Sequence, residues 1–367
     1  MKRKILILAN NDMGLYKFRK ELIEELLNNN DVAISLPDGE FIKPLEELGC
    51  SFINTDINRR GTNPITDLKL LFSYINILRR EAPDMVITYT IKPNIYGGLV
   101  CGLHNIPFAV NVTGLGTAFQ FDNWIKRIVV FLYRLALKKV KIVFFENTED
   151  KQIFIKNGIV NEDKACLLMG AGVNLKTYSL IEYPKEDMTR FLFIGRVMKE
   201  KGINELFDSM RELIADGEKV HLDVVGGLEE DYRNIISKYE NEGWLTYHGV
   251  QKDVRPFIAN CHCFVLPSWH EGMANTNLEA AACGRPVITS RIHGCLESVI
   301  DGVTGFLVER NNKNELYKKM KEFSKITIHR RREMGLLGRT HMKSKFDKRS
   351  VVGITVSRIY CILKALE

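Results

Sequence analysis

The sequence lacks both of the glycine-rich patterns that are typical of common nucleotide sites. Neither half contains G-x-G-x-x-G after an expected strand, because Gly114-Leu115-Gly116 and Gly170-Ala171-Gly172 are not followed by a third glycine. No G-x-x-x-x-G-K-[ST] sequence occurs either. We therefore expect neither a nicotinamide dinucleotide enzyme nor a P-loop nucleotidase.

The eight cysteines include no C-x-x-C pair. Cys261-His262-Cys263 is the one tight group, and we interpret it as alternating residues of a strand. No second ligand group follows at a spacing suited to zinc. The short apolar run at residues 5–9 meets Asn10-Asn11-Asp12, so a first strand fits it better than a signal peptide. We expect reduced cysteines in the cytosol.

Long uncharged apolar runs are also missing, so no membrane-spanning helix is expected. The balance of 52 basic against 45 acidic residues is modest, and no nucleic-acid recognition motif occurs, so we expect no nucleic-acid partner. With 45% hydrophobic and 26% charged residues, the composition is that of a soluble globular protein. A chain of 367 residues is long enough for two domains.

Apolar segments with strand and helix patterns alternate along both halves. In the first half, strands are expected at residues 5–9, 31–36, 85–90, 108–112 and 142–146. In the second half, they are expected at 190–194, 221–225, 245–248, 263–266, 287–289 and 305–308. This succession predicts α/β domains with doubly wound parallel sheets, whose ligands bind beyond the carboxyl ends of the strands. Periodicity lapses between Val173 and Asp187, so we expect domains at 1–178 and 179–347, with a final helix at 348–367.

The segment from Ser268 to Ile288 is the most informative part of the chain. A strand that ends at Pro267 is followed by a polar loop and then by an Ala-rich helix, which Gly284 and Pro286 end. Free N–H groups at a helix start attract phosphate. Glu271 and Glu279 flank this helix start, so one acid can accept hydrogen bonds from a sugar and the other from a ribose. The alternative is a capped helix with two solvated acids.

A second polar segment follows the first strand of the second half, with the sequence Gly195-Arg196-Val197-Met198-Lys199-Glu200-Lys201-Gly202. Gly195 lets a ligand approach the backbone closely. Arg196 and Lys201 bring two cations to this strand end, as a diphosphate leaving group requires when its bond to the sugar breaks. The alternative is a solvated basic turn.

Together these segments resemble the donor site of the retaining GT-B glycosyltransferases of family 4. The Glu-x7-Glu pattern matches as Glu271 and Glu279, followed by Gly284-Arg285-Pro286-Val287-Ile288. The Gly-Arg-x4-Lys-Gly segment, which holds the donor pyrophosphate in this family, matches completely. Residues 247–254 resemble the loop that flanks the nucleoside. The resemblance implies two Rossmann-like domains facing a cleft, with the last helix crossing back to the first domain.

On this resemblance, the catalytic residues are Glu271, Arg196 and Lys201. We expect donor contacts at Gly14, Gly195, Gly226, Gly249, Val254, Gly272, Met273, Ala274, Asn275, Thr276 and Glu279. We expect no cofactor and no metal site. His248 is a possible ligand group or a hydrogen-bonded strand histidine.

The acceptor side rests on residues 88–96 and 111–116, which resemble segments of bacterial family-4 enzymes that extend polyprenyl-diphosphate sugars. We expect acceptor contacts at Asp12, Lys92, Thr113 and Glu146. Lys92 either meets an acceptor phosphate or is a surface lysine at a helix start. Asp12 and Glu146 lie at expected strand ends, where either could position or deprotonate a hydroxyl, although Asp12 could instead cap a helix.

Residues 124–141 contain six Lys or Arg and no acid. If this segment is one helix, Arg127, Arg134, Lys138 and Lys141 share a stripe. Such a stripe either docks on anionic lipid headgroups or is the solvated face of a core helix.

The sequence thus predicts a retaining, metal-independent glycosyltransferase. The expected reaction moves a hexose or N-acetylhexosamine from a UDP-sugar to a polyprenyl-diphosphate-linked glycan in capsule, O-antigen or related surface polysaccharide synthesis. The expected location is cytoplasmic, at the periphery of the inner membrane. The alternatives are a GT-B nucleotide-sugar epimerase, for which the glutamate pair fits poorly, and a non-catalytic module that binds sugar nucleotide or lipid.

Overall fold

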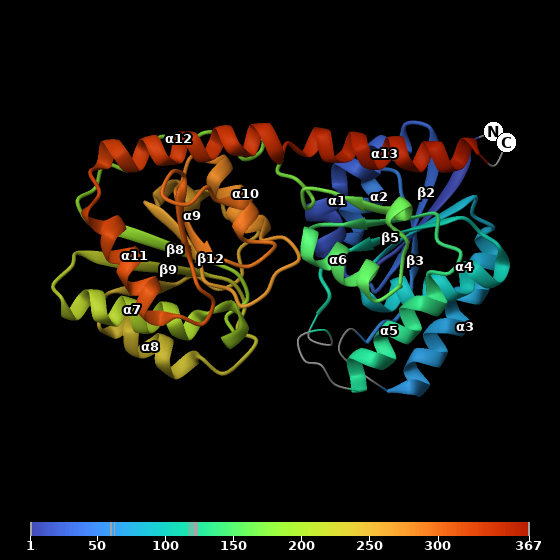
Figure 1. Ribbon diagram of the computed structural model, residues 1–367, viewed down its shortest axis with the longest axis horizontal. Coiled ribbons are helices and arrows are strands. Elements are labelled where there is room, and N and C mark those ends of the chain that lie inside the picture. Colours follow the sequence, from blue (N-terminus) through green and yellow to red (C-terminus); the bar gives the residue numbers. More distant parts are fainter. Residues whose placement is uncertain (1, 59–60, 62, 117–118, 120–123, 366–367) are drawn as a thin grey trace. The chain divides into compact units, whose positions relative to one another are not determined.

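The computed structural model describes residues 2–58, 61, 63–116, 119 and 124–365. They form two compact units, one comprising Met1–Ala171 with Lys348–Glu367 and the other Gly172–Asp347 (Figure 1). The division falls after Ala171, a few residues before the boundary expected at residue 178.

The first unit contains a parallel sheet in the order β3-β2-β1-β4-β5-β6-β7. Its strands are β1 (Arg3–Leu8), β2 (Asn30–Leu36), β3 (Ser51–Asn54), β4 (Met85–Tyr89), β5 (Phe108–Val112), β6 (Ile142–Phe145) and β7 (Ala165–Leu167). The order reverses between β1 and β4, which makes this the sheet's topological switch point. Residues of β4, β5 and β6 are buried throughout, as expected for parallel strands that are covered on both faces.

Helices cover both faces of this sheet. They are α1 (Asp12–Leu27), α2 (Ile42–Glu47), α3 (Pro64–Glu81), η1 (Pro93–Gly97), α4 (Gly98–His104), α5 (Trp124–Ala136), α6 (Thr148–Lys156), η3 (Glu162–Lys164) and α13 (Lys348–Lys364). Buried residues of α1, α2 and α13 share one core cluster with the sheet. Those of α3, α4, α5 and α6 form a second cluster with it. The last helix therefore belongs to the first unit, where it packs against α1.

The second unit repeats this order as β10-β9-β8-β11-β12-β13, with the switch point between β8 and β11. Its strands are β8 (Thr189–Ile194), β9 (Val220–Val225), β10 (Leu245–Tyr247), β11 (Cys263–Leu266), β12 (Val287–Ser290) and β13 (Gly305–Val308). Its helices are η4 (Lys199–Lys201), α7 (Ile203–Ala215), α8 (Arg233–Asn241), α9 (Arg255–Asn260), α10 (Asn275–Ala282), η5 (Leu296–Ser298), α11 (Lys313–Lys325) and α12 (Ile328–Lys345). All strand pairs in both sheets are parallel, so the prediction of doubly wound α/β domains is confirmed.

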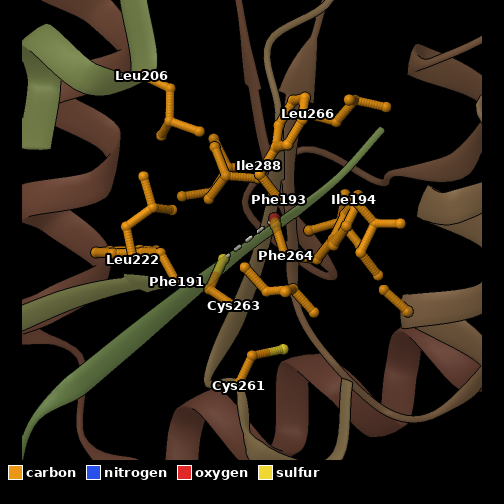
Figure 2. Packing of buried hydrophobic residues seen from close by; sticks show 14 of the residues in the cluster. Phe191, Phe193, Ile194, Leu206, Leu222, Cys261, Cys263, Phe264, Leu266 and Ile288 are labelled. Atoms are coloured by element: carbon orange, nitrogen blue, oxygen red, sulfur yellow. Dashed lines mark hydrogen bonds between the residues drawn. The ribbon is translucent and has the colours of Figure 1, made fainter. Parts of the chain in front are cut away.

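The switch point of the second unit lies in a dense apolar core. Phe191 and Phe193 of β8 and Phe264 of β11 are completely buried, with Leu206 of α7 and Ile288 of β12 around them (Figure 2). Burial of this kind stabilises the fold by about 1.5–3 kcal/mol for each large apolar side chain. The polar loops that follow β8 and β11 therefore start from a rigid base.

The prediction for residues 124–141 is wrong in one respect. Helix α5 ends at Ala136, so Lys138 lies in a turn and Lys141 directly precedes β6. Leu137 and Val140 are buried in this turn, because the chain must leave the helix to enter the sheet. The four cations therefore do not form one helical stripe.

Candidate active site

Three of the expected donor glycines meet where β8, β9 and β10 end. Gly195 donates its N–H to the carbonyl of Val225 at 2.9 Å, and Gly226 donates to the carbonyl of Gly249 at 2.8 Å. Gly226 has a φ of 144°, and a Cβ built on it would lie 1.8 Å from the carbonyl oxygen of Gly195. Only glycine fits there, and the result is a bare backbone edge that a flat ligand can approach.

The loop after β8 carries the two expected cations. The side chain of Arg196 is 49% exposed and lies 3.9 Å from the carboxylate of Glu229. Lys201 ends η4, and Gly202 follows with a φ of 71°. A Cβ on Gly202 would lie 2.1 Å from the carbonyl oxygen of Pro267, so this loop packs closely against the end of β11.

Lys201 and Glu271 are in direct contact. The Lys201 ammonium donates to the Glu271 carboxylate at 2.5 Å, and the Ser268 hydroxyl donates to the same oxygen at 2.8 Å. Only 16% of the Lys201 side chain and 13% of the Glu271 side chain are exposed. The structure therefore brings together the cation expected at the diphosphate and the acid expected at the sugar.

Helix α10 begins next to this pair, and no side chain caps its N-terminus at Ala274. The loop before it is anchored because the N–H of Ala274 donates to the carbonyl of Gly294 at 2.7 Å. Met273 and Ala274 are buried, while Gly272, Asn275 and Thr276 are half-buried. The N–H groups of Asn275 and Asn277 already donate to the carbonyls of Met273 and Ala274, so this helix start would attract an anion mainly through the positive end of the helix dipole. Glu279 lies one turn further along α10, and Val254 is the N-cap residue of α9.

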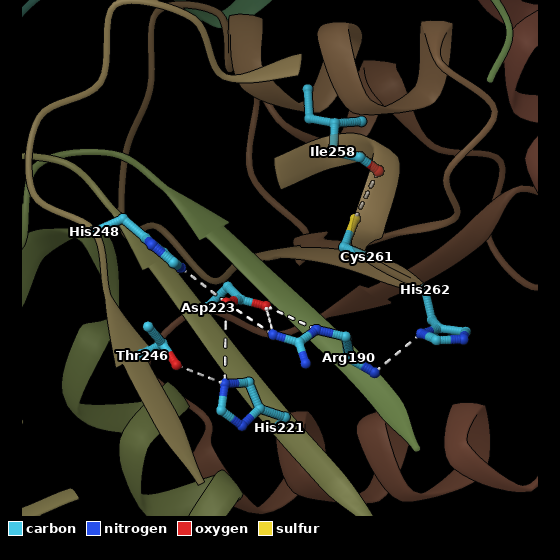
Figure 3. A network of polar contacts seen from close by, with 8 residues as sticks. All are labelled: Arg190, His221, Asp223, Thr246, His248, Ile258, Cys261 and His262. Atoms are coloured by element: carbon cyan, nitrogen blue, oxygen red, sulfur yellow. Dashed lines mark hydrogen bonds and ion pairs between the residues drawn. The ribbon is translucent and has the colours of Figure 1, made fainter. Parts of the chain in front are cut away.

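His221, His248 and His262 of the second unit each have a hydrogen-bond partner (Figure 3). His248 contacts the Asp223 carboxylate at 2.9 Å, and Arg190 binds the same carboxylate with two nitrogens. This supports the interpretation of His248 as a hydrogen-bonded histidine. Nδ1 of His262 accepts a hydrogen bond from the backbone N–H of Arg190 at 3.1 Å. The Cys261 thiol donates to the carbonyl of Ile258, and burial raises the pKa of Cys261 to about 12.

The expected residues of the first unit lie at the carboxyl ends of its strands. Asn11, and not Asp12, caps α1, because its side chain accepts the N–H of Gly14 at 2.7 Å. Asp12 accepts the backbone N–H of Phe41 at 2.8 Å, so it fastens the segment before α2. The helix-cap interpretation of Asp12 is therefore wrong. Gly14 lies in the first turn of α1, in a different unit from the other expected donor residues.

The other acceptor candidates are half-buried or buried. Lys92 donates to the carbonyl of Gly61 at 2.7 Å and to the Asp67 carboxylate at 2.6 Å. Its ammonium is thus held in place by α3 and the segment before it. Thr113 is half-buried directly after β5.

Glu146 is buried directly after β6, where it forms an ion pair with the buried Arg19 of α1. The Arg19 guanidinium also lies 5.1 Å from the ring centre of Tyr89. The hydroxyl of Tyr89 is buried without a hydrogen-bond partner. Glu146 is therefore held by a cation, which favours a positioning role over that of a free base.

Three residues of the site were not predicted from the sequence. Ser268 binds Glu271, and Gly294 anchors the loop before α10. Burial raises the pKa of the Tyr178 phenol, and the nearby Glu279 carboxylate raises it further. Gly294 follows the strand that is expected at residues 287–289, and a glycine after a strand could have indicated it. Tyr178 lies far from the motifs in sequence, so no spacing pattern indicates it.

Two kinds of feature are absent from the described residues. No three His, Cys, Asp or Glu side chains gather there as a metal site would require. None of the helices in the described ranges is long and apolar enough to span a membrane.

Comparisons with known proteins agree with this architecture. The family model described as "Glycosyl transferase 4-like" matches residues 4–147, and the model "Glycosyl transferases group 1" matches residues 181–337. The crystal structure of HepE from Anabaena in complex with UDP and glucose has a TM-score of 0.81 to this chain at 18% identity, and the match covers 98% of this chain and 99% of that one.

Curated relatives are similar over much of the chain. The N,N'-diacetylbacillosaminyl-diphospho-undecaprenol alpha-1,3-N-acetylgalactosaminyltransferase of Campylobacter jejuni is 28% identical, over 86% of this chain and 88% of its own. The UDP-Gal:alpha-D-GlcNAc-diphosphoundecaprenol alpha-1,3-galactosyltransferase of Escherichia coli is 26% identical, over 69% of each chain.

The two sheets form a GT-B fold, and the two family models show that the chain is a glycosyltransferase. The chain belongs to the family of group 1 and family-4-like glycosyltransferases, and the predictions of this fold and activity are confirmed.

Proposed function

We propose that this glycosyltransferase moves a hexose or N-acetylhexosamine from a UDP-sugar to a polyprenyl-diphosphate-linked glycan during surface polysaccharide synthesis. The observation that carries the donor assignment is the cluster at the second switch point. There, Arg196, Lys201 and the uncapped start of α10 can surround a diphosphate. The acceptor assignment is supported by the two curated relatives, whose names specify undecaprenol-diphosphate sugars.

Each part of the donor then has a matching group in the second unit. The nucleobase lies along the backbone edge of Gly195, Gly226 and Gly249, flanked by Val254. Glu279 accepts the ribose hydroxyls and Glu271 the sugar hydroxyls. Carboxylates suit this role because each has about four lone-pair positions for hydroxyl donors.

Arg196, Lys201 and the positive end of the α10 dipole stabilise the charge that develops on the leaving diphosphate. Protein groups thus supply the positive charge, so we propose that the transfer needs no divalent cation. Attack from the face that the diphosphate leaves would keep the α configuration without a protein nucleophile. The alpha-1,3 linkage in the name of the Escherichia coli relative fits retention, since its UDP-galactose donor is itself an α-glycoside.

The acceptor enters through the first unit, where Asp12, Lys92, Thr113 and Glu146 follow the strand ends. Lys92 offers its ammonium to an acceptor phosphate while Asp67 holds it in place. Glu146, fixed by Arg19, orients the acceptor hydroxyl.

We also propose that α5 meets the anionic membrane surface on the cytoplasmic face of the inner membrane. The exposed side of α5 is mostly apolar, with Trp124 70%, Ile128 48% and Phe131 58% exposed, and Arg127 and Arg134 are exposed beside them. On α3, which like α5 packs against η1, Phe72 is 56% exposed. Residues 124–145 contain six Lys or Arg and no Asp or Glu, so no acid of this segment would repel an anionic surface. An apolar face bordered by cations matches an anionic lipid interface better than a basic stripe alone.

Release of UDP tests the reaction. The enzyme is incubated with UDP-glucose, UDP-galactose and their N-acetylated forms, each with and without lipid extracted from bacterial membranes. The proposal expects UDP release that requires the lipid, together with an α-linked product by NMR. Conversion of a UDP-sugar to its epimer without lipid would identify an epimerase. Donor binding without UDP release under any condition would identify a binding module.

A further inference from the structure

A completely buried serine, Ser268, holds the acid that the proposed function assigns to the donor sugar. The Ser268 hydroxyl donates to Oε1 of Glu271 at 2.8 Å, and the Lys201 ammonium donates to the same oxygen. Both of these hydrogen bonds therefore use Oε1. The Glu271 side chain is 13% exposed, so its Oε2 can accept hydrogen bonds from the hydroxyl groups of a ligand.

The backbone around this hydrogen bond is held by neighbouring loops. Directly after Ser268, the N–H of Trp269 donates to the carbonyl of Glu200 at 2.9 Å. The backbone of Glu271 packs against Gly294, where a Cβ would lie 2.6 Å from the carbonyl oxygen of Glu271. Gly294 has a φ of 87°, so a side chain there would be strained as well as too close. With the backbone held, the carboxylate of Glu271 is the part that its two hydrogen-bond donors must orient.

The two donors respond differently to a bound diphosphate. Lys201 is a cation with 16% of its side chain exposed, and the proposed function assigns it to the diphosphate. The Ser268 hydroxyl is neutral and completely buried, so a diphosphate neither attracts it strongly nor reaches it. Ser268 can therefore keep its hydrogen bond to Glu271 while the ligand draws the Lys201 ammonium away.

We propose that Ser268 is a positioning residue for the donor sugar: its hydroxyl keeps Glu271 in the orientation that accepts sugar hydroxyls while the diphosphate occupies Lys201. This rests on the proposed function, in which Glu271 binds the sugar and Lys201 the diphosphate. Without the serine hydroxyl, the sugar itself must order the Glu271 carboxylate, which weakens binding. The loss affects only ligands that carry a sugar, so Ser268 contributes to the preference for a UDP-sugar over UDP.

Calorimetry without acceptor tests this with UDP and with UDP-glucose, UDP-galactose and their N-acetylated forms. The measured quantity is the ratio of the affinity for the best-bound UDP-sugar to the affinity for UDP. Ser268→Ala is expected to lower this ratio by about three- to tenfold, the cost of ordering one side chain, and to leave UDP binding unchanged. The KM for the UDP-sugar should rise by a similar factor, while the KM for the lipid acceptor is kept. In a Glu271→Ala background, Ser268→Ala should have no further effect, because the two residues act as a unit.

Two further variants separate the hydroxyl from its volume and its position. Ser268→Cys fills similar space with a weak hydrogen-bond donor, so it should behave like Ser268→Ala. Ser324→Ala is the matched control, because it removes a serine hydroxyl of α11 in the same unit that donates to the Glu218 carboxylate at 3.0 Å. This control should bind every ligand like the wild type. Thermal unfolding confirms that each variant is folded.

The outcomes separate the inference from the proposed function. If Ser268→Ala leaves the affinity ratio unchanged, or Ser268→Cys restores it, while Glu271→Ala lowers it, the positioning role is wrong and the sugar assignment stands. If Glu271→Ala itself leaves the ratio unchanged, Glu271 does not bind the sugar, and both the inference and that part of the proposed function fail.

Discussion

Lys201 and Glu271 are bound to each other at 2.5 Å, yet the proposed function assigns them to different parts of the donor. A diphosphate near Lys201 must compete with the Glu271 carboxylate, and the two anions repel each other. We therefore expect this ion pair to lower the affinity for UDP. When a sugar is attached, its hydroxyls donate to Glu271, and these hydrogen bonds compensate for the repulsion. Release of UDP after transfer is favoured by the same competition.

Glu271→Gln is accordingly expected to tighten UDP binding by about tenfold, which is the equivalent of about 1.4 kcal/mol. Turnover with a UDP-sugar should fall, since the sugar loses its acceptor group. Lys201→Ala should weaken UDP binding and lower turnover by about two to three powers of ten. Calorimetry and initial rates measure these effects. Glu333→Gln, which removes an acid from an ion pair with Arg330 on α12, is the control. Weaker UDP binding by Glu271→Gln would contradict the competition.

His262 makes stability depend on pH. Burial, and after it the nearby guanidinium of Arg331, lowers the pKa of His262 from the usual 6.5 to about 4. The unfolded chain binds this proton more tightly than the folded one. The contribution to stability is therefore complete above about pH 6.5 and is lost as the pH falls towards 4, amounting to at most about 3 kcal/mol.

His262→Asn should reduce this pH dependence, because an Asn side chain can still accept the N–H of Arg190 but takes up no proton. Urea unfolding of wild type and variant between pH 7 and pH 4.5 measures the difference. Equal slopes of unfolding free energy against pH in the two proteins would show that His262 does not titrate in this range.

At the scale of elements, hydrophobic patterns predicted eleven of the thirteen strands in the described residues within a few residues, and missed the short strands β3 and β7. Buried parallel strands are continuous apolar runs bounded by polar loops, which a sequence displays directly. Helix α5 was predicted less well, because the apolar turn at Leu137 and Val140 extends the helical pattern beyond Ala136. The exposure of its apolar side was also missed, since periodicity does not reveal which face of a helix finds a partner.

That exposed side gives a prediction about the membrane. The double variant Ile128→Ser, Phe131→Ser should no longer bind vesicles containing anionic lipid. Its binding free energy loses about 25 cal/mol for each Å² of apolar surface that no longer enters the bilayer. Exchanging Ile354 of α13, which is 47% exposed, for Ser should change little. In a protein with Phe at positions 244 and 269, the emission of Trp124 should shift to the blue on vesicles. If the serine variant binds vesicles like the wild type, the apolar side of α5 is not the docking surface.

At the scale of the whole molecule, the two sheets share one strand order, and each has its switch point at its first strand in the chain. This geometry explains why the donor motifs could be found from the sequence. Both follow strands that flank the second switch point, so local spacing and three-dimensional position coincide. The partners of these motifs, such as Ser268, Gly294 and Tyr178, are brought in by side-chain and loop packing. The spacing of residues along the sequence does not indicate those contacts.

The most direct test of the donor site is the binding of UDP in the presence of EDTA. Calorimetry should show one site in the wild type and a large loss of affinity in Arg196→Ala and Lys201→Ala. Lys219→Ala should bind UDP like the wild type, because Lys219 precedes β9 and so lies at the amino-terminal end of the strands, away from the donor site. Added Mg²⁺ should leave these affinities nearly the same, because protein cations and the start of α10 carry the diphosphate charge. Binding that requires Mg²⁺, or that survives in both variants, would contradict the assignment of Arg196 and Lys201 to the diphosphate.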